Sequence, residues 1–557
     1  MSNGRGALTV VKPSEYQPEL PMDRLIVAEP PGEEAVPMDV LFVGGGPAGL
    51  AGAIELARLV KEEGERGGEL GELEIGVLEK SESLGEHCLS GAIVEPGPFR
   101  ALFPEVADED FPFRRRVPGD RVYLMTSDGA RRVPTPPTMR NEGNFIASIC
   151  EIVRWMGERA EELGVNVFTG FPAASLLVEG DRVSGVRTAA AGLDREGEPG
   201  SGYMPATDVT ARITALAEGT RGSLTQAYLR WQRIGSANPQ IYALGVKELW
   251  EVRRPLDSVI HTMGWPLPDD AFGGSWLYPM ADDLVSLGLV VGLDYRQTTL
   301  DVHELLQRFK SHPLVRGYLE GGELVEWGAK TIPEGGWYSL PERLHGDGLL
   351  IIGDAAGLVN VPALKGIHYA VQSGILAART MFAALEKGGT SASDLAGYDR
   401  QLREGFVGKE LHRTRNMRLA FKSGLYSGGL KAALMTVSGG VLLGGRIDAA
   451  ADADEPREVA PAKPAPAGEL TVSKVDAVFR SGNTTRDDIP SHLIVGEKVP
   501  PEVADLYTHM CPAGVYERDG DRLVVNAPNC IDCKATDVLG PRWTVREGGS
   551  GPSYKRM

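Results

Sequence analysis

Near the N-terminus, the apolar positions predict a strand, a glycine turn and a helix in succession. In DVLFVGGGPAGLAGAIELARLV (39–60), an apolar run precedes three glycines, and apolar residues then recur at helical spacing. LEIGVLEK (73–80) predicts the next strand, and 145–164 predicts a second helix. Residues 165–188 predict strands that join at the turn EGD. Strands separated by helices favour a parallel, doubly wound sheet in an α/β protein.

The C-terminal third changes character twice. SGGLKAALMTVSGGVLLGG (427–445) is apolar and glycine-rich, and its only charged residue is Lys431. The next stretch, 448–468, is rich in Pro and Ala with mixed charges, which predicts a flexible linker. We expect a separate C-terminal module after it. No uninterrupted apolar run reaches about 18 residues, so a membrane-spanning helix is not expected.

Length, charge and cysteine usage narrow the class of protein. A chain of 557 residues predicts several domains. Its formal charge of −18 argues against nucleic acid as a partner. Five cysteines do not make a disulfide framework, so a reducing compartment is expected. Residues 1–36 show neither a signal peptide nor a transit peptide, which favours a bacterial or archaeal protein facing the cytoplasm.

The first glycine motif predicts a dinucleotide site. Gly44, Gly46 and Gly49 fit G-x-G-x-x-G between a strand and a helix: one glycine for the tight turn, one for close approach of a pyrophosphate, and one for helix packing. Glu79 ends the second strand, where an acid can accept hydrogen bonds from ribose hydroxyls. The polar insertion 61–72 explains the long gap between turn and acid. The alternative is a glycine turn without a ligand.

A second nucleotide motif lies at 346–385. LLIIGDAAG predicts a strand that ends at Asp354, which can hydrogen-bond a ribityl chain. A helix after Gly366 would direct its positive end at the pyrimidine edge of a flavin. The alternative is that Asp354 only caps a helix. Together with TALAEGTRGSL (214–224), the pattern resembles the glutathione-reductase-like class of FAD proteins. No second dinucleotide fingerprint predicts a separate NAD(P)H domain.

Several unusual strings in a fixed order resemble a more specific family, the electron transfer flavoprotein–ubiquinone oxidoreductases. The strings are GGGPAGL, LGEHCLSGAIVEPG (84–97), GVKELWEV (245–252), HTMGWPL (261–267), FGGSWLY (272–278), LVVGLDY (289–295), GDAAGLVNVPALKG, CPAGVYE and EGGSGPSYKRM.

The resemblance implies that FAD and a 4Fe–4S cluster receive electrons singly from reduced electron transfer flavoprotein and pass them to membrane quinone. It also implies peripheral, monotopic attachment to the cytoplasmic face of the inner membrane. No catalytic side chains are expected, because the cofactors carry the chemistry. The residues expected at FAD are Gly44, Gly46, Pro47, Ala48, Gly49, Glu79, Lys80, Ser90, Gly91, Gly353, Asp354, Lys365 and Gly366.

Gly273 and Gly274 match the paired glycines that the family places beside the quinone headgroup. Glycines there would let a flat ring meet backbone N–H groups, whereas in isolation such a pair favours a β-turn. A hairpin at 121–139 with Arg131 and Arg132 matches the family's membrane-dipping surface, as does 424–445. The alternative for 424–445 is a buried helix.

We therefore expect an α/β (overall α+β) protein: a glutathione-reductase-like FAD domain with an inserted quinone domain, followed by a ferredoxin-like domain. The predicted divisions are an N-terminal arm (1–36), a discontinuous FAD domain (37–100, 145–225 and 340–420), a membrane-surface hairpin (101–144), a quinone-binding domain (226–339), a membrane-surface helix (421–446), a linker (447–468) and the iron–sulfur domain (469–557).

The cysteines depart from the family pattern. Cys511, Cys530 and Cys533 match three of its four cluster ligands, and Thr536 stands in the fourth place. Four outcomes follow: a 4Fe–4S cluster whose fourth ligand is Thr536, Asp537, Asp532, His509 or water; a 3Fe–4S cluster; zinc held by the cysteines and His509; or no metal. Cys88 and Cys150 are expected to be ordinary buried thiols.

Other functions stay open at this point. A flavin-dependent reductase of isoprenoid double bonds has a related fold but need not carry the cysteine module. An electron-carrier or docking subunit would lack quinone chemistry of its own. NADPH-dependent monooxygenation is compatible with the FAD motifs but disfavoured by the cysteines. Quinone turnover by the isolated protein would separate the first two from a quinone reductase.

Overall fold

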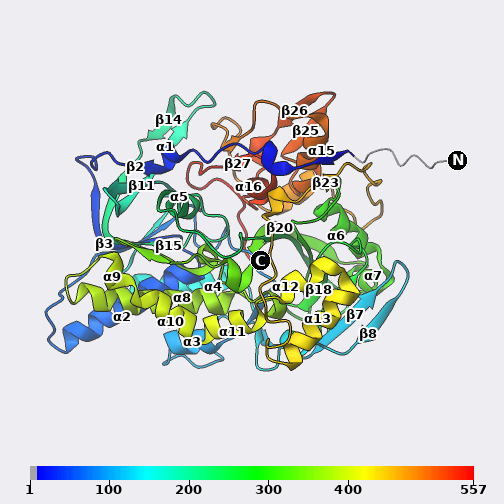
Figure 1. Cartoon of the computed structure of the whole chain (residues 1–557), viewed down its shortest axis with the longest axis horizontal. Helices are drawn as coiled ribbons and strands as arrows, with labels where there is room; N and C mark the ends of the chain where they lie inside the picture. Colours follow the sequence, from blue (N-terminus) through cyan, green and yellow to red (C-terminus); the bar gives the residue numbers. More distant parts are fainter. Residues whose placement is uncertain (1–8) are drawn as a thin grey trace.

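The structure is a computed structural model that describes residues 9–557, so residues 1–8 of the expected N-terminal arm lie outside the described residues. Two large sheets lie side by side, and a small C-terminal module sits over the junction between them (Figure 1). The three parts meet around one cavity, described below.

The first sheet has nine strands, and its centre is parallel. β15 is its branch point, because β3 pairs along one side while β12 and β22 share the other side. This confirms the predicted parallel α/β sheet. The strands are β2 (Ile26–Val27), β3 (Val36–Val43), β4 (Ile75–Glu79), β10 (Asn166–Thr169), β11 (Ala173–Glu179), β12 (Arg182–Thr188), β15 (Asp208–Leu216), β21 (His345–Gly346) and β22 (Leu349–Ile351).

Helices cover the lower face of this sheet in the view of Figure 1. α2 and α8 pack closely because Gly374 has no side chain: a Cβ there would lie 2.2 Å from the Ala48 carbonyl oxygen. The helices of this half are α1 (Met22–Leu25), α2 (Pro47–Glu65), α3 (Gly97–Leu102), α4 (Ile149–Glu162), α5 (Ser223–Trp231), α8 (Ile367–Leu385), α9 (Ala392–Leu395), α10 (Gly397–Glu404) and α11 (Phe406–Thr414).

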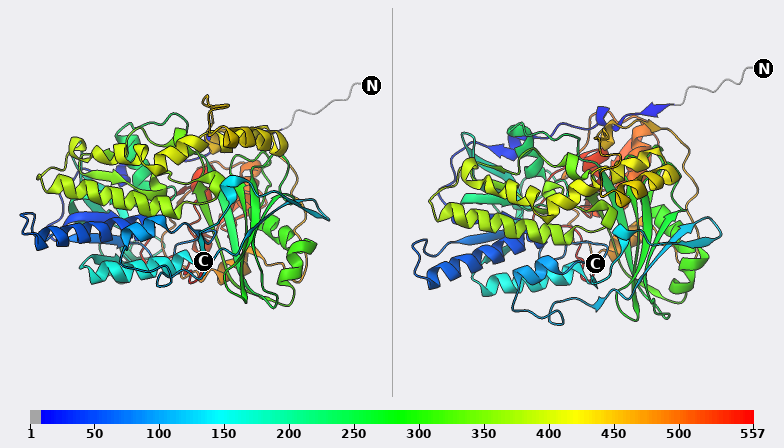
Figure 2. Two further views of the ribbon diagram at one scale, coloured as in Figure 1. Left: turned by 90° about the horizontal axis from the view of Figure 1, so that it is seen from below. Right: turned by 60° about the horizontal axis from the view of Figure 1, so that its bottom comes forward.

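The second sheet has seven strands in the order β20-β16-β19-β18-β17-β7-β8. β7 and β8 form the hairpin expected at the membrane surface, and β7 pairs in parallel with β17, so the hairpin extends this sheet. The strands are β7 (Asp120–Met125), β8 (Ala130–Val133), β16 (Tyr242–Glu251), β17 (Val259–Gly264), β18 (Gly273–Pro279), β19 (Leu284–Gly292) and β20 (Glu323–Pro333). Helices α6 (Val302–Ser311) and α7 (Pro313–Leu319) flank it, and α12 (Met417–Ala420) and α13 (Leu425–Val437), in yellow, lie at one end of its strands (Figure 2).

The C-terminal module shares its apolar core with the second sheet. Trp327 of β20 belongs to the same buried cluster as Val503 and Tyr507 of the module. The module comprises α14 (Lys474–Arg480), α15 (Pro501–Met510), α16 (Ala535–Leu539), and the strand pairs β24 (Leu493–Ile494) with β27 (Arg542–Trp543) and β25 (Tyr516–Asp519) with β26 (Arg522–Val525).

The N-terminal arm crosses from the first sheet to this module. β2 pairs with β11, whereas Gln17 donates a hydrogen bond to the Asp537 carbonyl oxygen at 2.9 Å. Small strand groups complete the fold: β1 (Val10–Val11) with β23 (Arg457–Glu458), β13 (Ala191–Leu193) with β14 (Pro199–Met204), and β5 (Ile93–Val94) with β9 (Phe145–Ile146) and β6 (Arg115–Arg116).

The expected flexible linker is held against the protein body in its middle part. Asp452 and Arg457 are 1% and 0% exposed. The Arg457 guanidinium donates to the Leu293 carbonyl oxygen at 2.5 Å and lies 4.6 Å from the centre of the Tyr295 ring. The prediction is therefore wrong for this stretch, because composition does not reveal which charged residues find buried partners.

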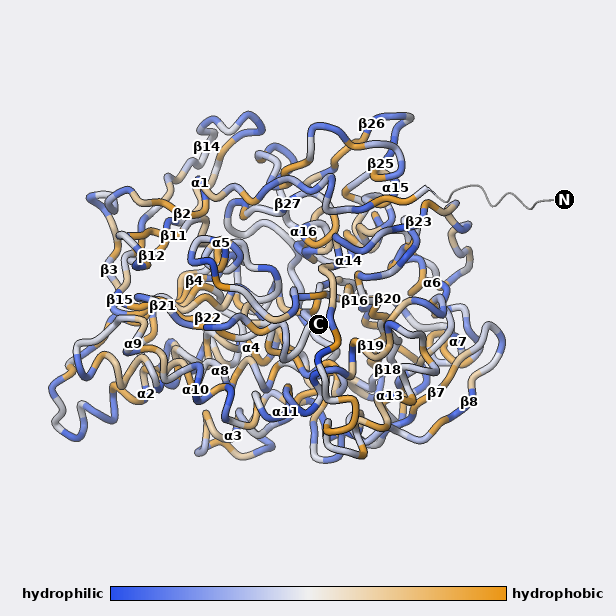
Figure 3. The backbone as a smooth tube through the Cα atoms, viewed as in Figure 1, coloured by the Kyte–Doolittle hydropathy of each residue, from blue (hydrophilic) through white to orange (hydrophobic). Residues whose placement is uncertain are grey.

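Figure 3 shows apolar backbone positions gathered along the inner strands and helices, with one apolar stretch at the lower edge near α13. Among residues 9–557, no helix is both long and apolar enough to cross a bilayer.

Candidate functional site

Three glycines of the first motif have different tasks. Gly44 has a φ of 118°, and a Cβ there would lie 2.3 Å from the Ala217 carbonyl oxygen. A Cβ at Gly49 would lie 2.0 Å from the Gly44 carbonyl oxygen. A Cβ at Gly46 would meet nothing within 4 Å. Gly44 and Gly49 therefore serve the packing of the turn, whereas Gly46 leaves a space open at the start of α2, where backbone N–H groups favour phosphate.

Glu79 stands at the end of β4, as predicted, and braces the glycine turn. Its Oε2 accepts a hydrogen bond from Gly45 N at 2.9 Å, and its Oε1 accepts from Ser81 N at 2.9 Å. Lys80 lines the cavity, but its ammonium group forms an ion pair with Asp532 of the C-terminal module. The contact of both residues with a nucleotide remains a prediction.

The second motif brings Asp354 to the same space. It follows Gly353 in a short turn after β22, and its carboxylate accepts no hydrogen bond from the residues that the structure describes. Burial raises the pKa of Asp354 to about 6. Such a carboxylate is suited to receive hydroxyl donors from a ligand. Gly366 precedes α8, and burial lowers the pKa of Lys365 beside it to about 8.

One cavity of about 970 Å³ connects these groups. Its volume lies at the upper end of the range for cofactor pockets. Ser90 and Gly91 also line it. Its wall combines residues of four parts: the glycine turn, the second sheet, the C-terminal module and α13. The open space at Gly46 and the unpaired carboxylate of Asp354 both fit FAD.

The paired glycines lie in this cavity wall at the start of β18. A Cβ at Gly273 would lie 2.0 Å from the Val290 carbonyl oxygen, and one at Gly274 would lie 2.8 Å from the Thr262 carbonyl oxygen. Both positions form strand pairs, so the β-turn alternative is wrong. The sheet itself requires glycine here, and the contact with quinone remains a prediction.

A buried histidine–tyrosine pair lines the same cavity as the paired glycines. The Tyr278 hydroxyl and His261 Nε2 are 2.7 Å apart, and both residues line the cavity. Burial lowers the pKa of His261 to about 3, so the imidazole is neutral. Both residues fall within HTMGWPL and FGGSWLY, but neither was predicted as a site residue, because their pairing joins β17 to β18 and no local pattern shows it.

The three cysteines of the module are buried together. Cys511 caps the C-terminus of α15, and Cys530 and Cys533 lie in a loop with left-handed backbone at Asp532 and Lys534. Burial, followed by the nearby Asp532, raises the pKa of Cys530 to about 12. Burial, followed by the charges of Cys511 and Cys530, raises the pKa of Cys533. Three adjacent thiols in a dry site are suited to a metal cluster, which takes thiolates as ligands.

Thr536 faces the same region. Its Oγ1 lies 2.6 Å from the Tyr516 hydroxyl and donates to the Pro541 carbonyl oxygen at 3.2 Å. Burial raises the pKa of Tyr516, and the charges of Cys511 and Cys530 raise it further. The Thr536 hydroxyl therefore has two hydrogen-bond partners, Tyr516 and Pro541.

Asp532 joins the cysteine loop to the first sheet. Its Oδ1 accepts hydrogen bonds from Trp543 Nε1 at 2.9 Å and from the Arg546 guanidinium at 3.0 Å, and Lys80 pairs with the same carboxylate. β20 contributes as well: Lys330 donates to the Asp532 carbonyl oxygen at 3.2 Å. These contacts fix the cysteine loop against the cavity wall.

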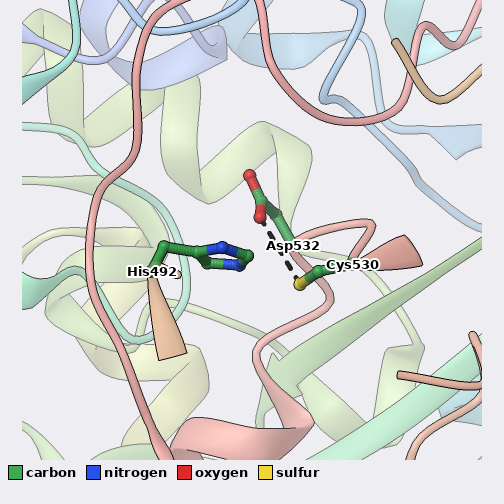
Figure 4. Close-up of side chains that lie close together, drawn as sticks. All are labelled: His492, Cys530 and Asp532. Atoms are coloured by element: carbon green, nitrogen blue, oxygen red, sulfur yellow. Dashed lines mark hydrogen bonds between the residues drawn. The ribbon is translucent and has the colours of Figure 1, made fainter. Parts of the chain in front are cut away.

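His492 lies beside this loop (Figure 4). An imidazole nitrogen of His492, Cys530 Sγ and a carboxylate oxygen of Asp532 lie within 4.8 Å of one another. Both ring nitrogens of His492 are buried and have no hydrogen-bond partner among the described residues. His492 was not predicted, because it lies far from the cysteines in sequence.

The two remaining cysteines differ from each other. Cys150 is fully buried and donates to the Cys88 carbonyl oxygen at 3.2 Å, which confirms an ordinary structural thiol. Cys88 is only half-buried and lines the cavity, so the prediction is wrong for this residue. The local pattern LGEHCLSG does not show that Cys88 borders an open space.

The fold and the site define a class: a FAD-dependent oxidoreductase with an appended iron–sulfur module. Comparisons with solved structures agree on the fold. A geranylgeranyl bacteriochlorophyll reductase-like protein from Thermoplasma acidophilum matches with a TM-score of 0.55 and 20% identity, over 73% of this chain and 92% of that chain. A flavin-dependent brominase matches with a TM-score of 0.51 and 17% identity, over 73% of this chain and 94% of that chain.

Family models and curated relatives are more specific. Residues 242–332 match the model "ETF-QO, ubiquinone-binding", and 468–555 match "Electron transfer flavoprotein-ubiquinone oxidoreductase, 4Fe-4S". The Oryza sativa electron transfer flavoprotein-ubiquinone oxidoreductase is 38% identical, over 94% of each chain. The Pseudomonas aeruginosa relative is 36% identical, over 94% of this chain and all of the other. The chain belongs to the electron transfer flavoprotein-ubiquinone oxidoreductase family, with FAD and a 4Fe–4S cluster as its cofactors.

Proposed function

We propose that this protein accepts electrons from reduced electron transfer flavoprotein and passes them, through the cluster and FAD, to quinone at the membrane surface. One observation carries the proposal. A single cavity is lined by the open turn at Gly46, by Gly273 and Gly274, and by Lys534 and Trp543 of the cysteine module. The residues proposed for flavin and quinone thus share one cavity, which borders the module that carries the cysteines.

In this proposal the protein holds and orients its cofactors. The N-terminus of α2 receives the pyrophosphate above Gly46, Asp354 receives ribityl hydroxyls, and α8 points its positive end at the flavin ring. Cys511, Cys530 and Cys533 hold the cluster. When bound, the cluster exchanges single electrons and the flavin exchanges one or two, which matches a one-electron donor to a two-electron acceptor.

Quinone reduction also needs protons, and the His261–Tyr278 pair is placed to supply them. The neutral imidazole and the Tyr278 hydroxyl share a hydrogen bond in the wall of the cavity that Gly273 and Gly274 also line. In this proposal the Tyr278 hydroxyl gives its proton to the quinone and takes one from His261 Nε2. His261 then regains a proton from water at Nδ1, a buried atom without a hydrogen-bond partner among the described residues, so that neither side chain keeps a charge.

Attachment to the cytoplasmic face of the inner membrane is part of the proposal. On α13, Tyr426, Leu430 and Val437 are 77%, 66% and 89% exposed and recur at helical spacing. Val441, Leu442 and Leu443 extend the exposed apolar surface beyond the helix. Tyr426 also lines the cavity, as does Leu124 of the hairpin that carries the exposed Arg131 and Arg132. An apolar helix beside basic side chains suits an anionic lipid surface, from which quinone would enter.

The test is steady-state reduction of a soluble ubiquinone analogue by the purified protein, with reduced electron transfer flavoprotein as the sole donor. We expect turnover that requires both the donor and bound FAD. Turnover with NADPH and no flavoprotein donor would contradict the proposal, and so would reduction of the protein's flavin without any quinone product.

A further inference from the structure

The cluster site of this chain offers three thiols. In the fourth place stands a threonine whose hydroxyl already takes part in two hydrogen bonds. The Thr536 hydroxyl has one proton, and it donates that proton to the Pro541 carbonyl oxygen. Tyr516 has no other hydrogen-bond partner among the described residues, so its hydroxyl donates to Thr536 Oγ1. To bind iron as an alkoxide, Thr536 would lose its proton and its bond to Pro541. A neutral alcohol with one lone pair left is a weak ligand for iron.

The neighbouring carboxylates also have hydrogen-bond and ion-pair partners already. Asp532 is held by Lys80, Arg546 and Trp543. In Asp537, Oδ2 accepts from Arg221 Nε at 2.8 Å and Oδ1 accepts from Trp543 N at 3.1 Å. Both side chains are 1% exposed. Turning either one toward iron would leave buried cations without their partner, which is costly.

The histidines are the remaining candidates. His509 donates its Nδ1–H to the Asp505 carbonyl oxygen within its own helix, so only Nε2 is free to bind iron, and the test below includes His509→Gln. His492 has free nitrogens, but one of them already lies within 4.8 Å of Cys530 Sγ. The ligands of a cubane cluster sit at different corners, separated by the width of the cluster. A nitrogen so near Cys530 belongs beside that corner and does not reach the one at Thr536.

We propose that the cluster corner at Thr536 has no protein ligand and that its iron is exchangeable, so that the site interconverts between 4Fe–4S and 3Fe–4S forms. The inference rests on the proposed function only in assuming that Cys511, Cys530 and Cys533 bind a cluster. The expected step is oxidative: a [4Fe–4S]²⁺ core gives [3Fe–4S]¹⁺, one Fe²⁺ and one electron, and an outer-sphere oxidant such as ferricyanide accepts the electron. Added Fe²⁺ with a reductant reverses the step.

The experiment compares three full-length proteins, purified and reconstituted with iron and sulfide without oxygen: wild type, Thr536→Cys and Thr536→Val. Each is titrated with ferricyanide, and released Fe²⁺ and the paramagnetic resonance spectrum are recorded. Wild type should release one iron per cluster and develop the spectrum of a 3Fe–4S centre. Thr536→Cys should retain its iron because a thiolate now closes the corner. Thr536→Val keeps the shape of threonine without its hydroxyl and should release iron as wild type does.

Several results would overturn the inference. Retention of all iron by wild type would do so, as would equal release by Thr536→Cys. Tenfold faster release from Thr536→Val would show that the hydroxyl is a ligand. Strong nitrogen coupling to the reduced cluster that disappears in His492→Gln or in His509→Gln would assign the corner to that histidine. Zinc, or no iron at all, in reconstituted wild type would refute the cluster itself.

One further measurement covers a variant that does not fold, and the choice of readouts separates this inference from the proposed function. Should Thr536→Cys fail to fold, ⁵⁷Fe added back to oxidised wild type should label a single, spectroscopically distinct site, whereas labelling spread over all sites would contradict the inference. None of these readouts uses quinone. A protein that shows the exchangeable iron but no quinone turnover would refute the proposed function and leave the inference standing.

Discussion

At the residue scale, glycines with the same sequence signature have separate physical roles. At Gly44, Gly49 and Gly273, a Cβ would clash with the protein's own backbone. At Gly46, a Cβ would meet no protein atom, so the space there is open to a ligand. The sequence motifs predict that these glycines are needed, but they do not show which glycines serve packing and which one leaves space for a ligand. The role of each glycine depends on which backbone atoms would lie close to its Cβ. These atoms come from strands such as β15, which pairs with β3 although the two are far apart in the sequence.

The open space at Gly46 gives the first prediction. Gly46→Val should fold, because no protein atom lies within 4 Å of the new Cβ, and it should lose FAD, because the side chain occupies the pyrophosphate space. The measurement is the flavin-to-protein ratio after purification. Gly64→Val, at an exposed and equally open position of the same helix, is the control and should keep its flavin. Full flavin content in Gly46→Val would show that this turn is not the cofactor site.

Tyr278 gives a second prediction. Tyr278→Phe removes the hydroxyl that bonds His261 and should slow quinone reduction by roughly 10²-fold, the low end for acid–base catalysis. Reduction of the bound flavin by the donor flavoprotein should not change. Tyr295→Phe is the control, because the Tyr295 hydroxyl is buried without a partner among residues 9–557 and does not line the cavity. Equal quinone rates in wild type and Tyr278→Phe would remove the pair from the proton route.

At the element scale, hydrophobic pattern predicts the strand, turn and helix that hold the first nucleotide motif, and the structure has all three as β3, Gly44–Gly46 and α2. Local pattern is informative there because each element is continuous in sequence. The same pattern fails for the linker, for Cys88 and for the Asp532 network, where side chains far apart in the sequence decide burial. His492 and the His261–Tyr278 pair are missed for the same reason.

The docked linker gives a prediction on pH. Burial raises the pKa of Asp452 to about 8, from an ordinary value of 3.8. Between about pH 4 and pH 8 the folded protein therefore holds a proton that the unfolded chain has lost, so stability falls as pH rises through this window, by at most about 1.4 kcal/mol per pH unit. Asp452→Asn should remove this part of the slope in the thermal unfolding midpoint, because its amide oxygen can still accept from Tyr242 N.

Asp448→Asn, at an exposed position of the same segment, is the matched control and should leave the slope unchanged. Parallel pH profiles for wild type and Asp452→Asn would mean that the carboxylate is ionised in the folded protein.

The exposed face of α13 gives a prediction on membrane binding. Leu430→Glu with Val437→Glu places two charges in the apolar face and should weaken binding to anionic lipid vesicles by roughly tenfold or more for each residue. Vesicle co-sedimentation measures the effect. Tyr203→Glu with Met204→Glu is the control: both residues are exposed on β14, at the opposite corner of the molecule from α13 in Figure 1. Equal loss in control and test variants would point to net charge and not to α13.

At the scale of the whole molecule, one cavity joins parts that the sequence presents as separate domains. The C-terminal module shares a core with the second sheet, and Asp532 pairs with Lys80 of the first sheet. The resemblance of short strings predicts the fold class, the cofactors and the three cysteines from sequence. It does not predict how closely the cysteine loop meets the cavity, because that contact depends on β20, Trp543 and Arg546 together.

Because one cavity joins these parts, the central claim is that electrons flow through this protein from the donor flavoprotein to quinone. The most direct measurement is an anaerobic sequence on one sample, followed by flavin absorbance and by paramagnetic resonance of the cluster. Reduced electron transfer flavoprotein is added first and a soluble ubiquinone analogue second. We predict that both centres become reduced at the first step and reoxidise at the second, with quinol formed in proportion. Centres that the donor does not reduce, or that stay reduced when quinone is added, would contradict the account.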